Sequence, residues 1–260
     1  MRSARRLLRR KERQATGTFL AEGRQAVREA LLRPGTVLQL FVAADAVQRH
    51  TDLLDLATEA GVPSARLPAG QLAGLSDTVT PQGVVAVCGA VDVPAAEVWA
   101  RRPRLVVVCD QVRDPGNLGT VIRCADAFGA DAVLISGDAV DVYNPKAVRA
   151  STGSVFHLPL VVDVDLGAAA ADARTAGLQV LGADGTAARD VEQLRRTGEL
   201  ARPTAWVMGN EAWGLPAERA ALLDATVALP LYGRAESLNL STAAAVLLYA
   251  SATAQREADR

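Results

Sequence analysis

One stretch of the sequence constrains the fold more than any other: the five apolar residues 105–109, which read LVVVC. A strand that is apolar on both faces must be buried on both faces, as happens in a parallel sheet covered by helices. An Asp-Pro-Gly turn at 114–116 and an expected helix over 118–128, closed by Gly129, follow it directly. The pattern therefore predicts a parallel α/β sheet in the C-terminal part of the chain.

The apolar segments after this strand continue the same alternation to the C-terminus. Further strands are expected at 132–135, 156–162, 178–181, 204–208 and 226–229. Further helices are expected at 145–150, 168–176 and 240–252. Alternation of this kind is typical of α/β domains.

The first 90 residues show a second, shorter alternation. Helices at 22–32 and 46–60 alternate with strands at 37–42 and 83–89, which is enough for a small α/β sandwich. A polar stretch containing prolines follows and is interpreted as a link between domains. The sequence therefore predicts a first domain over 1–93, a linker over 94–103 and a second domain over 104–260.

Composition excludes several classes of protein. Half of the 260 residues are hydrophobic, so the chain buries a large core and is neither disordered nor a coiled-coil rod. The net charge is −1, so a nucleic acid would have to be held by local patches. There is no apolar stretch of about 20 residues and no signal peptide, and the three cysteines lack metal-ligand spacing. We expect a cytoplasmic protein with no membrane segment and no metal.

The N-terminus is the one strongly charged segment. Seven of its first 13 residues are basic: Arg2, Arg5, Arg6, Arg9, Arg10, Lys11 and Arg13. Like charges this dense repel one another unless a polyanion is near, which favours an element that contacts phosphates. A solvated helix face is the alternative interpretation.

Three loops expected at the carboxyl ends of strands carry unusual residues. The first loop is 114–123 (DPGNLGTVIR), the second is 208–215 (MGNEAWGL) and the third is 230–241 (PLYGRAESLNLS). Ligands of parallel α/β sheets bind at this edge, where loops meet helix N-termini. Any one of these residues could be an ordinary helix cap or turn residue, but the third loop holds more small polar residues than capping needs.

The first loop invites comparison with a dinucleotide site. Its glycines are spaced Gly116-x-x-Gly119 instead of GxGxxG, and Ser136 and Gly137 stand where an acidic residue is expected after the second strand. Asp138 lies close enough to keep a nucleotide-dependent oxidoreductase as an alternative. A Walker phosphate loop is absent because no GK[ST] sequence occurs.

Taken in order, the three loops resemble the motifs of the TrmH/SpoU-type RNA ribose 2′-O-methyltransferases of the SPOUT superfamily. The matching residues are Asn117-x-Gly119-x-x-x-Arg123-x-Ala125, Gly209-x-Glu211-x-x-Gly214-Leu215 and Glu236-Ser237-Leu238-Asn239-Leu240-Ser241. The resemblance covers about residues 104–255. More loosely, the segment before it resembles the ribosomal-protein-like substrate-binding domain of such enzymes.

The resemblance implies a trefoil-knotted methyltransferase domain, a homodimer and S-adenosylmethionine (SAM) as cofactor. It implies that the cofactor meets Gly209, Leu229 and Leu238, with Met208 and Leu231 beside them. The catalytic residues it implies are Arg123, Asn117, Glu211, Ser237 and Asn239. No metal is required.

The implied reaction transfers a methyl group to a ribose 2′-hydroxyl, so the substrate is RNA, since DNA lacks this group. Arg123 is interpreted as an electrostatic group that holds the nucleotide and stabilises developing alkoxide, because a guanidinium is always charged in proteins. Asn117 and Glu211 are expected to orient it or the ribose, and Ser237 and Asn239 to position the substrate and cofactor. Further basic candidates for RNA contact are Arg102, Arg104, Arg113, Arg149 and Arg234.

Several questions stay open at the level of sequence. Trp213 is interpreted either as a surface on which a base stacks or as a packing residue. Ribosomal RNA is the favoured substrate because of the extra N-terminal domain, and transfer RNA is the alternative. A non-catalytic RNA-binding or ribosome-assembly protein of the same fold is the other alternative.

Overall fold

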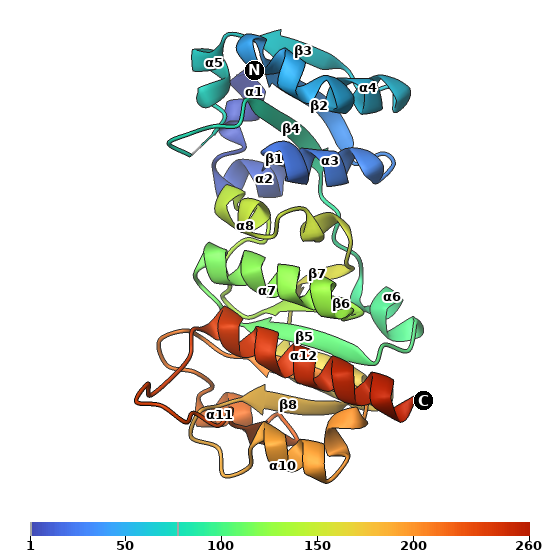
Figure 1. Ribbon diagram of the computed structural model, residues 1–260, viewed down its shortest axis with the longest axis vertical. Helices are drawn as coiled ribbons and strands as arrows, with labels where there is room; N and C mark the ends of the chain where they lie inside the picture. The colour runs from blue at the N-terminus through green and yellow to red at the C-terminus, as the bar shows by residue number, and fades with distance from the viewer. Residues whose placement is uncertain (1, 77) are drawn as a thin grey trace. The chain divides into compact units, whose positions relative to one another are not determined.

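The structure is a computed structural model that describes residues 2–76 and 78–260 (Figure 1). The chain forms two compact units. Unit 1 comprises the residues up to Val91 together with Asp141–His157, and unit 2 comprises Asp92–Val140 and Leu158–Arg260. The chain therefore passes between the units three times, after residues 91, 140 and 157.

Unit 1 is built on a four-stranded sheet in the order β1-β4-β2-β3. The strands are β1 (Thr18–Glu22), β2 (Val37–Ala43), β3 (Ser64–Leu67) and β4 (Val84–Gly89). β4 pairs antiparallel with β1 and β2, and β3 pairs parallel with β2. The helices are α1 (Arg2–Arg6), α2 (Arg10–Thr16), α3 (Arg24–Leu32), α4 (Thr51–Glu59), α5 (Ala69–Ala73) and α8 (Pro145–Ala150), with 3₁₀ turns at Ala44–His50 and Ser154–Phe156.

Segment 141–157 is anchored in unit 1 by packing and by charge. Phe19 of β1 stacks on Tyr143 and Phe156, with ring centroids 4.4 and 6.0 Å apart. Arg13 is buried and forms an ion pair with Asp141 at 2.7 Å. The strand expected at 156–162 is thus wrong at its start, because Phe156 belongs to the core of unit 1 and the strand begins only at Leu160.

Unit 2 holds a six-stranded sheet in the order β10-β8-β9-β5-β6-β7, and every pair in it is parallel. The parallel α/β class predicted from sequence is confirmed. The strands are β5 (Leu105–Asp110), β6 (Ala132–Ser136), β7 (Leu160–Val164), β8 (Gln179–Ala183), β9 (Thr204–Met208) and β10 (Ala225–Val227). The helices are α6 (Ala95–Ala100), α7 (Pro115–Phe128), α9 (Leu166–Thr175), α10 (Val191–Arg196), α11 (Ala217–Ala220) and α12 (Leu240–Ala258), with a 3₁₀ turn at Glu199–Ala201.

Helices cover both faces of this sheet, as the apolar run at 105–109 requires. All six residues of β5 are buried. Val106 and Val108 belong to a core cluster with residues of α9, such as Leu166. On the other face α7 and α12 run side by side (Figure 1), and the indole of Trp206 in β9 donates a hydrogen bond of 2.9 Å to Ser251 of α12.

The segment 94–103 contains helix α6, whose Val98 is buried in the same core cluster of unit 2. The trefoil knot and the homodimer that the family resemblance implies stay predictions. Across the described residues, no helix combines the length and the apolar character needed to cross a bilayer.

Candidate active site

The strand order of unit 2 brings the three loops to one edge of the sheet. β5 and β9 are neighbours, with Cys109 opposite Met208, so the first and second loops leave the sheet side by side. β8 is the next strand and β10 follows it, and the third loop begins shortly after β10. The strand order changes direction between β5 and β9, and such points are the usual ligand sites of parallel α/β sheets.

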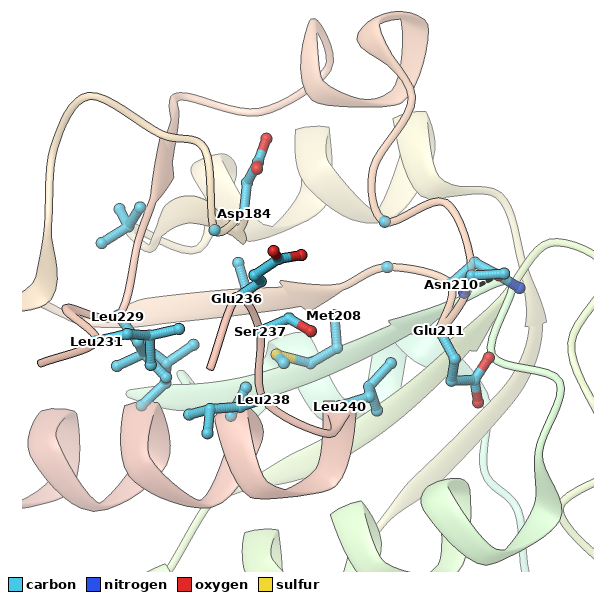
Figure 2. A pocket seen from close by; sticks show the side chains of 18 residues that line it. Asp184, Met208, Asn210, Glu211, Leu229, Leu231, Glu236, Ser237, Leu238 and Leu240 are labelled. Atoms are coloured by element: carbon cyan, nitrogen blue, oxygen red, sulfur yellow. Dashed lines mark hydrogen bonds between the residues drawn. The ribbon is translucent and has the colours of Figure 1, made fainter. Parts of the chain in front are cut away.

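A cavity of about 320 Å³ opens at this edge (Figure 2). All five residues expected to hold the cofactor line it: Met208, Gly209, Leu229, Leu231 and Leu238. Two of the expected catalytic residues, Glu211 and Ser237, line it as well. Figure 2 shows Leu229, Leu231 and Leu238 together at one end of the cavity over α12. Glu211 lies at the other end.

The second loop needs glycine at 209. A Cβ built on Gly209 would lie 2.5 Å from the carbonyl oxygen of Gly214 and 2.8 Å from Leu215. The loop closes on itself at this point, because Asn210 and Gly214 exchange backbone hydrogen bonds of 3.0 and 2.9 Å. Gly214 has φ +64°, a left-handed conformation that glycine adopts at little cost.

Glu211 joins the second loop to the first. Its carboxylate accepts hydrogen bonds from the backbone N–H groups of Asp114 at 3.0 Å and Arg113 at 3.2 Å. It also accepts one from the side-chain amide of Asn117 at 3.2 Å. These donors surround the N-terminus of α7, where a negative charge is favoured by the helix dipole.

The hydrogen bonds decide the ionisation of Glu211. Partial burial by itself would raise the pKa of this carboxyl, but its backbone and side-chain hydrogen bonds outweigh burial and hold the pKa below its usual value. Glu211 is therefore a carboxylate at neutral pH. A base that must accept a proton near pH 7 needs a higher pKa, so Glu211 is suited to orient groups and not to take up a proton.

Asn117 in turn joins the first loop to the third. Its side-chain oxygen accepts a hydrogen bond of 3.0 Å from the side-chain amide of Asn239. The oxygen of Asn239 caps α12 by accepting from the backbone N–H of Ser241 at 2.9 Å and from its hydroxyl at 2.6 Å. The carboxylate of Glu211 and the two asparagines thus form one network across the three motifs.

Arg123 lies outside this network. It is exposed on α7 and is not one of the residues that line the cavity. It lies six positions after Asn117, which places it on another side of the helix, about 9 Å further along the axis. The structure thus brings together four of the five expected catalytic residues and leaves Arg123 on a neighbouring surface.

Three polar residues of the cavity were not among the expected site residues, although two of them stand in the second and third loops. Asp184 and Glu236 line it with their carboxylates, and Asn210 lines it next to Glu211. Asp184 directly follows β8, so a search of every expected strand end would have found it. Among the described residues that line the cavity there is no Lys, Arg or His, so its charge is negative.

The basic candidates have different surroundings. Arg13 and Arg149 of unit 1 pair with Asp141 and with buried Glu22, so they serve the fold and the expectation that Arg13 contacts phosphate is wrong. Arg104 pairs with Asp259. Arg102 and Arg234 are exposed, as are Arg5, Arg9 and Arg10 at the N-terminus.

Comparison with known proteins agrees with this geometry. Residues 104–249 match the SpoU rRNA Methylase family, and residues 1–86 match the MRM3-like substrate binding domain. The 23S rRNA (guanosine(2553)-2′-O)-methyltransferase RlmP of Bacillus subtilis is 36% identical over 92% of this chain and 90% of its own length.

Two solved structures are similar over nearly the whole chain. The SpoU methyltransferase AviRb of Streptomyces viridochromogenes in complex with AdoMet has a TM-score of 0.84 and 31% identity, and the match covers 99% of this chain and 98% of that one. The AdoMet-bound rRNA methyltransferase of Sinorhizobium meliloti has a TM-score of 0.81 and 31% identity, over 96% and 92%.

Fold and motifs define a two-unit protein with a parallel α/β methyltransferase unit. The chain belongs to the SpoU rRNA methylase family, and the resemblance inferred from its three motifs is confirmed.

Proposed function

We propose that this protein transfers the methyl group of SAM to a ribose 2′-hydroxyl of ribosomal RNA. The single observation that carries the proposal is the cavity at the ends of β9 and β8. Its walls combine leucines with the carboxylates of Asp184, Glu211 and Glu236, and none of the described residues that line it is basic.

This lining fits SAM and fits a dinucleotide poorly. SAM carries a positive sulfonium and a positive amino group, which carboxylates attract, and an adenine ring, which leucines and backbone amides can hold. The phosphates of a nicotinamide dinucleotide need positive charge or free helix N-termini instead. Asp138, which kept that alternative open, is not among the described residues that line the cavity. The lining therefore favours the methyltransferase over the oxidoreductase.

When bound, the cofactor supplies a methyl group on a good leaving group, so the nucleophile sets the difficulty of the reaction. The backbone at Gly209, with Met208, Leu229, Leu231 and Leu238, would hold it. Hydrogen bonds among Glu211, Asn117 and Asn239 hold the three loops together. The hydroxyl of Ser237 lines the cavity. Positioning of two reactants can contribute about 7–11 kcal/mol, so this framework can supply much of the rate.

Arg123 is proposed to contact the RNA ribose or phosphate and to stabilise the developing alkoxide. Because it lies outside the cavity of its own chain, we place it at the cavity of a second copy in a homodimer. The exposed apolar side chains of Val246 and Tyr249 on α12, next to α7, support such an interface. The knot of unit 2 remains part of the same proposal.

The choice of ribosomal over transfer RNA and a cytoplasmic location are parts of the same proposal, and the names of the relatives support the first. RlmP, which matches this chain over 90% of its length, is named as a 23S rRNA enzyme. Unit 1, similar to a substrate-binding domain, presents Arg5, Arg9 and Arg10 on its surface.

The experiment supplies the full-length protein with methyl-labelled SAM and either 23S rRNA or total tRNA. We expect label in 23S rRNA at a bond that resists alkaline cleavage, because a methylated 2′-oxygen cannot attack the neighbouring phosphate. Label in tRNA alone would show that transfer RNA, and not ribosomal RNA, is the substrate. Failure to bind SAM in calorimetry would favour a non-catalytic RNA-binding protein.

The role of unit 1 has its own test. Replacing Arg5, Arg9 and Arg10 by alanine should weaken rRNA binding and flatten its salt dependence by about 0.7–0.9 log units per log unit of salt for each phosphate that is no longer neutralised. Deleting residues 1–13 is less informative because it also removes buried Arg13. Unchanged RNA affinity in the triple variant, measured by filter binding at moderate salt, would mark these arginines as a solvated face.

A further inference from the structure

Trp213, at the tip of the second loop, is unusual among the tryptophans of this protein. It is 51% exposed, whereas Trp206 is fully buried and Trp99 is half-buried. A tryptophan that serves packing is mostly buried, because the ring contributes a large apolar area. Half of Trp213 contacts solvent instead, so packing does not account for it.

The backbone that presents Trp213 is held firmly. Asn210 and Gly214 close the turn with two backbone hydrogen bonds. The side chain of Asn210 accepts from the backbone N–H of Ala212 at 2.8 Å and donates to the carbonyl of Gln111 at 2.8 Å. The turn is thus tied to the strand end that starts the first loop. A ring on such a turn loses little conformational entropy when it binds a partner.

A guanidinium lies beside this ring. The Cζ atom of Arg113 is 5.4 Å from the centroid of the Trp213 ring, within the range of a cation–π contact. The backbone N–H of Arg113 donates to Glu211, whose carboxylate lines the cavity. Ring and guanidinium therefore lie next to the end of the cavity where Glu211 is found, without being part of its lining.

We propose that Trp213 and Arg113 form a platform on which an unpaired base of the substrate RNA stacks next to the ribose to be methylated. The inference rests on the proposed function, because it assumes that RNA reaches the cavity. Specific recognition of RNA uses unstacked bases on aromatic rings and on guanidinium planes, and this pair offers both. The indole takes the base, and Arg113 contacts the adjacent phosphate.

Two observations favour RNA over a protein partner. The exposed apolar side chains suited to a dimer interface, Val246 and Tyr249, lie on α12 and not on the second loop. Arg113 is paired with Asp138 at 2.8 Å, but both side chains are more than half exposed. An exposed pair of this kind is worth about 0–1 kcal/mol, so a phosphate can displace the carboxylate.

The first test compares Trp213→Phe, Trp213→Leu and Trp213→Ala in the full-length protein. The probes are a short single-stranded RNA for binding and 23S rRNA with labelled SAM for turnover. We expect Phe to keep RNA affinity within about threefold, and Leu and Ala to lose about 5- to 150-fold, the range for one base–aromatic stack. KM for RNA should rise more than kcat falls, and SAM affinity should not change.

Intrinsic fluorescence locates the contact. RNA should quench the emission of the wild-type protein, and the quenching should disappear in Trp213→Phe, because Trp206 is fully buried and Trp99 lies on α6, outside the cavity lining. The Asp138→Asn variant should increase RNA affinity, in contrast to the Trp213 variants. It releases Arg113 and removes a negative charge, so RNA affinity should rise about two- to fivefold. Arg113→Ala should cancel that gain.

The outcomes separate this inference from the proposed function. Wild-type methylation of rRNA with normal KM in Trp213→Ala overturns the platform alone. RNA binding that depends on Trp213 without any methyl transfer overturns the proposed function and keeps the platform. A change from dimer to monomer in Trp213→Ala by sedimentation, with RNA affinity intact, would assign the ring to a protein interface and overturn the inference.

Discussion

The second and third loops line the same cavity but are held in different ways. The second loop is fixed by Gly209, by the Asn210–Gly214 hydrogen bonds and by the contacts of Glu211. In the third loop every residue from Leu231 to Asn239 is exposed, and within the described chain no backbone hydrogen bond is made by residues 231–238. Only Asn239 ties its end to the rest of the site.

This difference suggests that the two loops have different roles in cofactor binding. A preformed wall binds without an ordering cost, whereas an exposed segment loses conformational freedom when it closes on a ligand. We therefore expect the second loop to determine how tightly the cofactor binds, and the third loop to adapt to it. Arg234 of the third loop is exposed and is not among the described residues that line the cavity, and the second loop has no basic residue. We therefore expect Arg123 of α7 to supply the positive charge that the developing alkoxide needs.

The largest effect is expected for Arg123→Ala. If the loops only bind the cofactor and position the substrate, this change should lower kcat by about 100- to 1000-fold, as removal of one transition-state donor does. The affinity for SAM should stay within about twofold of the wild-type value. Single-turnover methyl transfer and calorimetry with SAM measure the two quantities. Near-native turnover would show that a residue of the loops, and not Arg123, stabilises the alkoxide, which would contradict the assignment of binding to the loops and of catalysis to α7.

A matched pair of glycine substitutions compares the two loops directly. Gly209→Ala should reduce SAM affinity by about 100-fold, because its Cβ collides with the backbone of Gly214. Gly233→Ala in the third loop meets no atom within 4 Å and has no positive φ, so SAM affinity should change less than about threefold. Calorimetry decides, and circular dichroism checks that both variants fold. Equal losses would mean that the third loop is as fixed as the second.

Asn239→Ala should have an intermediate effect. It removes the cap of α12 and the link to Asn117, and loss of such a cap costs about 0.5–2 kcal/mol of stability. Asn239→Asp keeps a cap acceptor but cannot donate to Asn117 while ionised. Thermal unfolding should therefore show the alanine variant to be the less stable, and turnover should fall in both. Full turnover in the aspartate variant would show that the Asn117–Asn239 link is dispensable.

The smallest effect concerns pH and Glu211. Its pKa in the folded protein lies below the ordinary value of about 4.3, so its contribution to stability is complete above that pH and is lost as pH falls through the lower folded value. Glu211→Gln should remove this part of the acid sensitivity and leave stability at pH 7 lower by about 1 kcal/mol. Urea unfolding from pH 3 to pH 7 measures the slope. An unchanged slope would contradict the role of its hydrogen bonds.

The sequence predicted the elements with strong periodicity best. The strand at 204–208 and the helix at 145–150 have the expected bounds, because an apolar run and an Asn-Pro start define them. β1 and β3 were missed. β1 follows a basic segment that was interpreted as a phosphate-contacting element or a solvated helix face, and β3 alternates between exposed and half-buried residues. The 46–60 helix begins in fact as a 3₁₀ turn.

The site was predicted where a motif spans it and missed where the fold alone assembles it. Glu211, Asn117 and Asn239 could be named because each stands in a recognisable loop. Asp184 belongs to no motif and joins the cavity only because β8 lies beside β9. Arg123 does not line the cavity of its own chain, which depends on its position around α7 and is not evident from its spacing in the sequence.

The three passages of the chain between the units have a consequence for protein engineering. A chimaera that exchanges unit 1 of this protein for that of a relative cannot be made with one splice near residue 92. Segment 141–157 supplies Asp141 to Arg13 and Tyr143 to Phe19, so the donor module must bring its own version of that segment into the middle of the recipient gene. Any exchange of unit 1 between relatives needs the same two insertions, so we expect the two units to be inherited together.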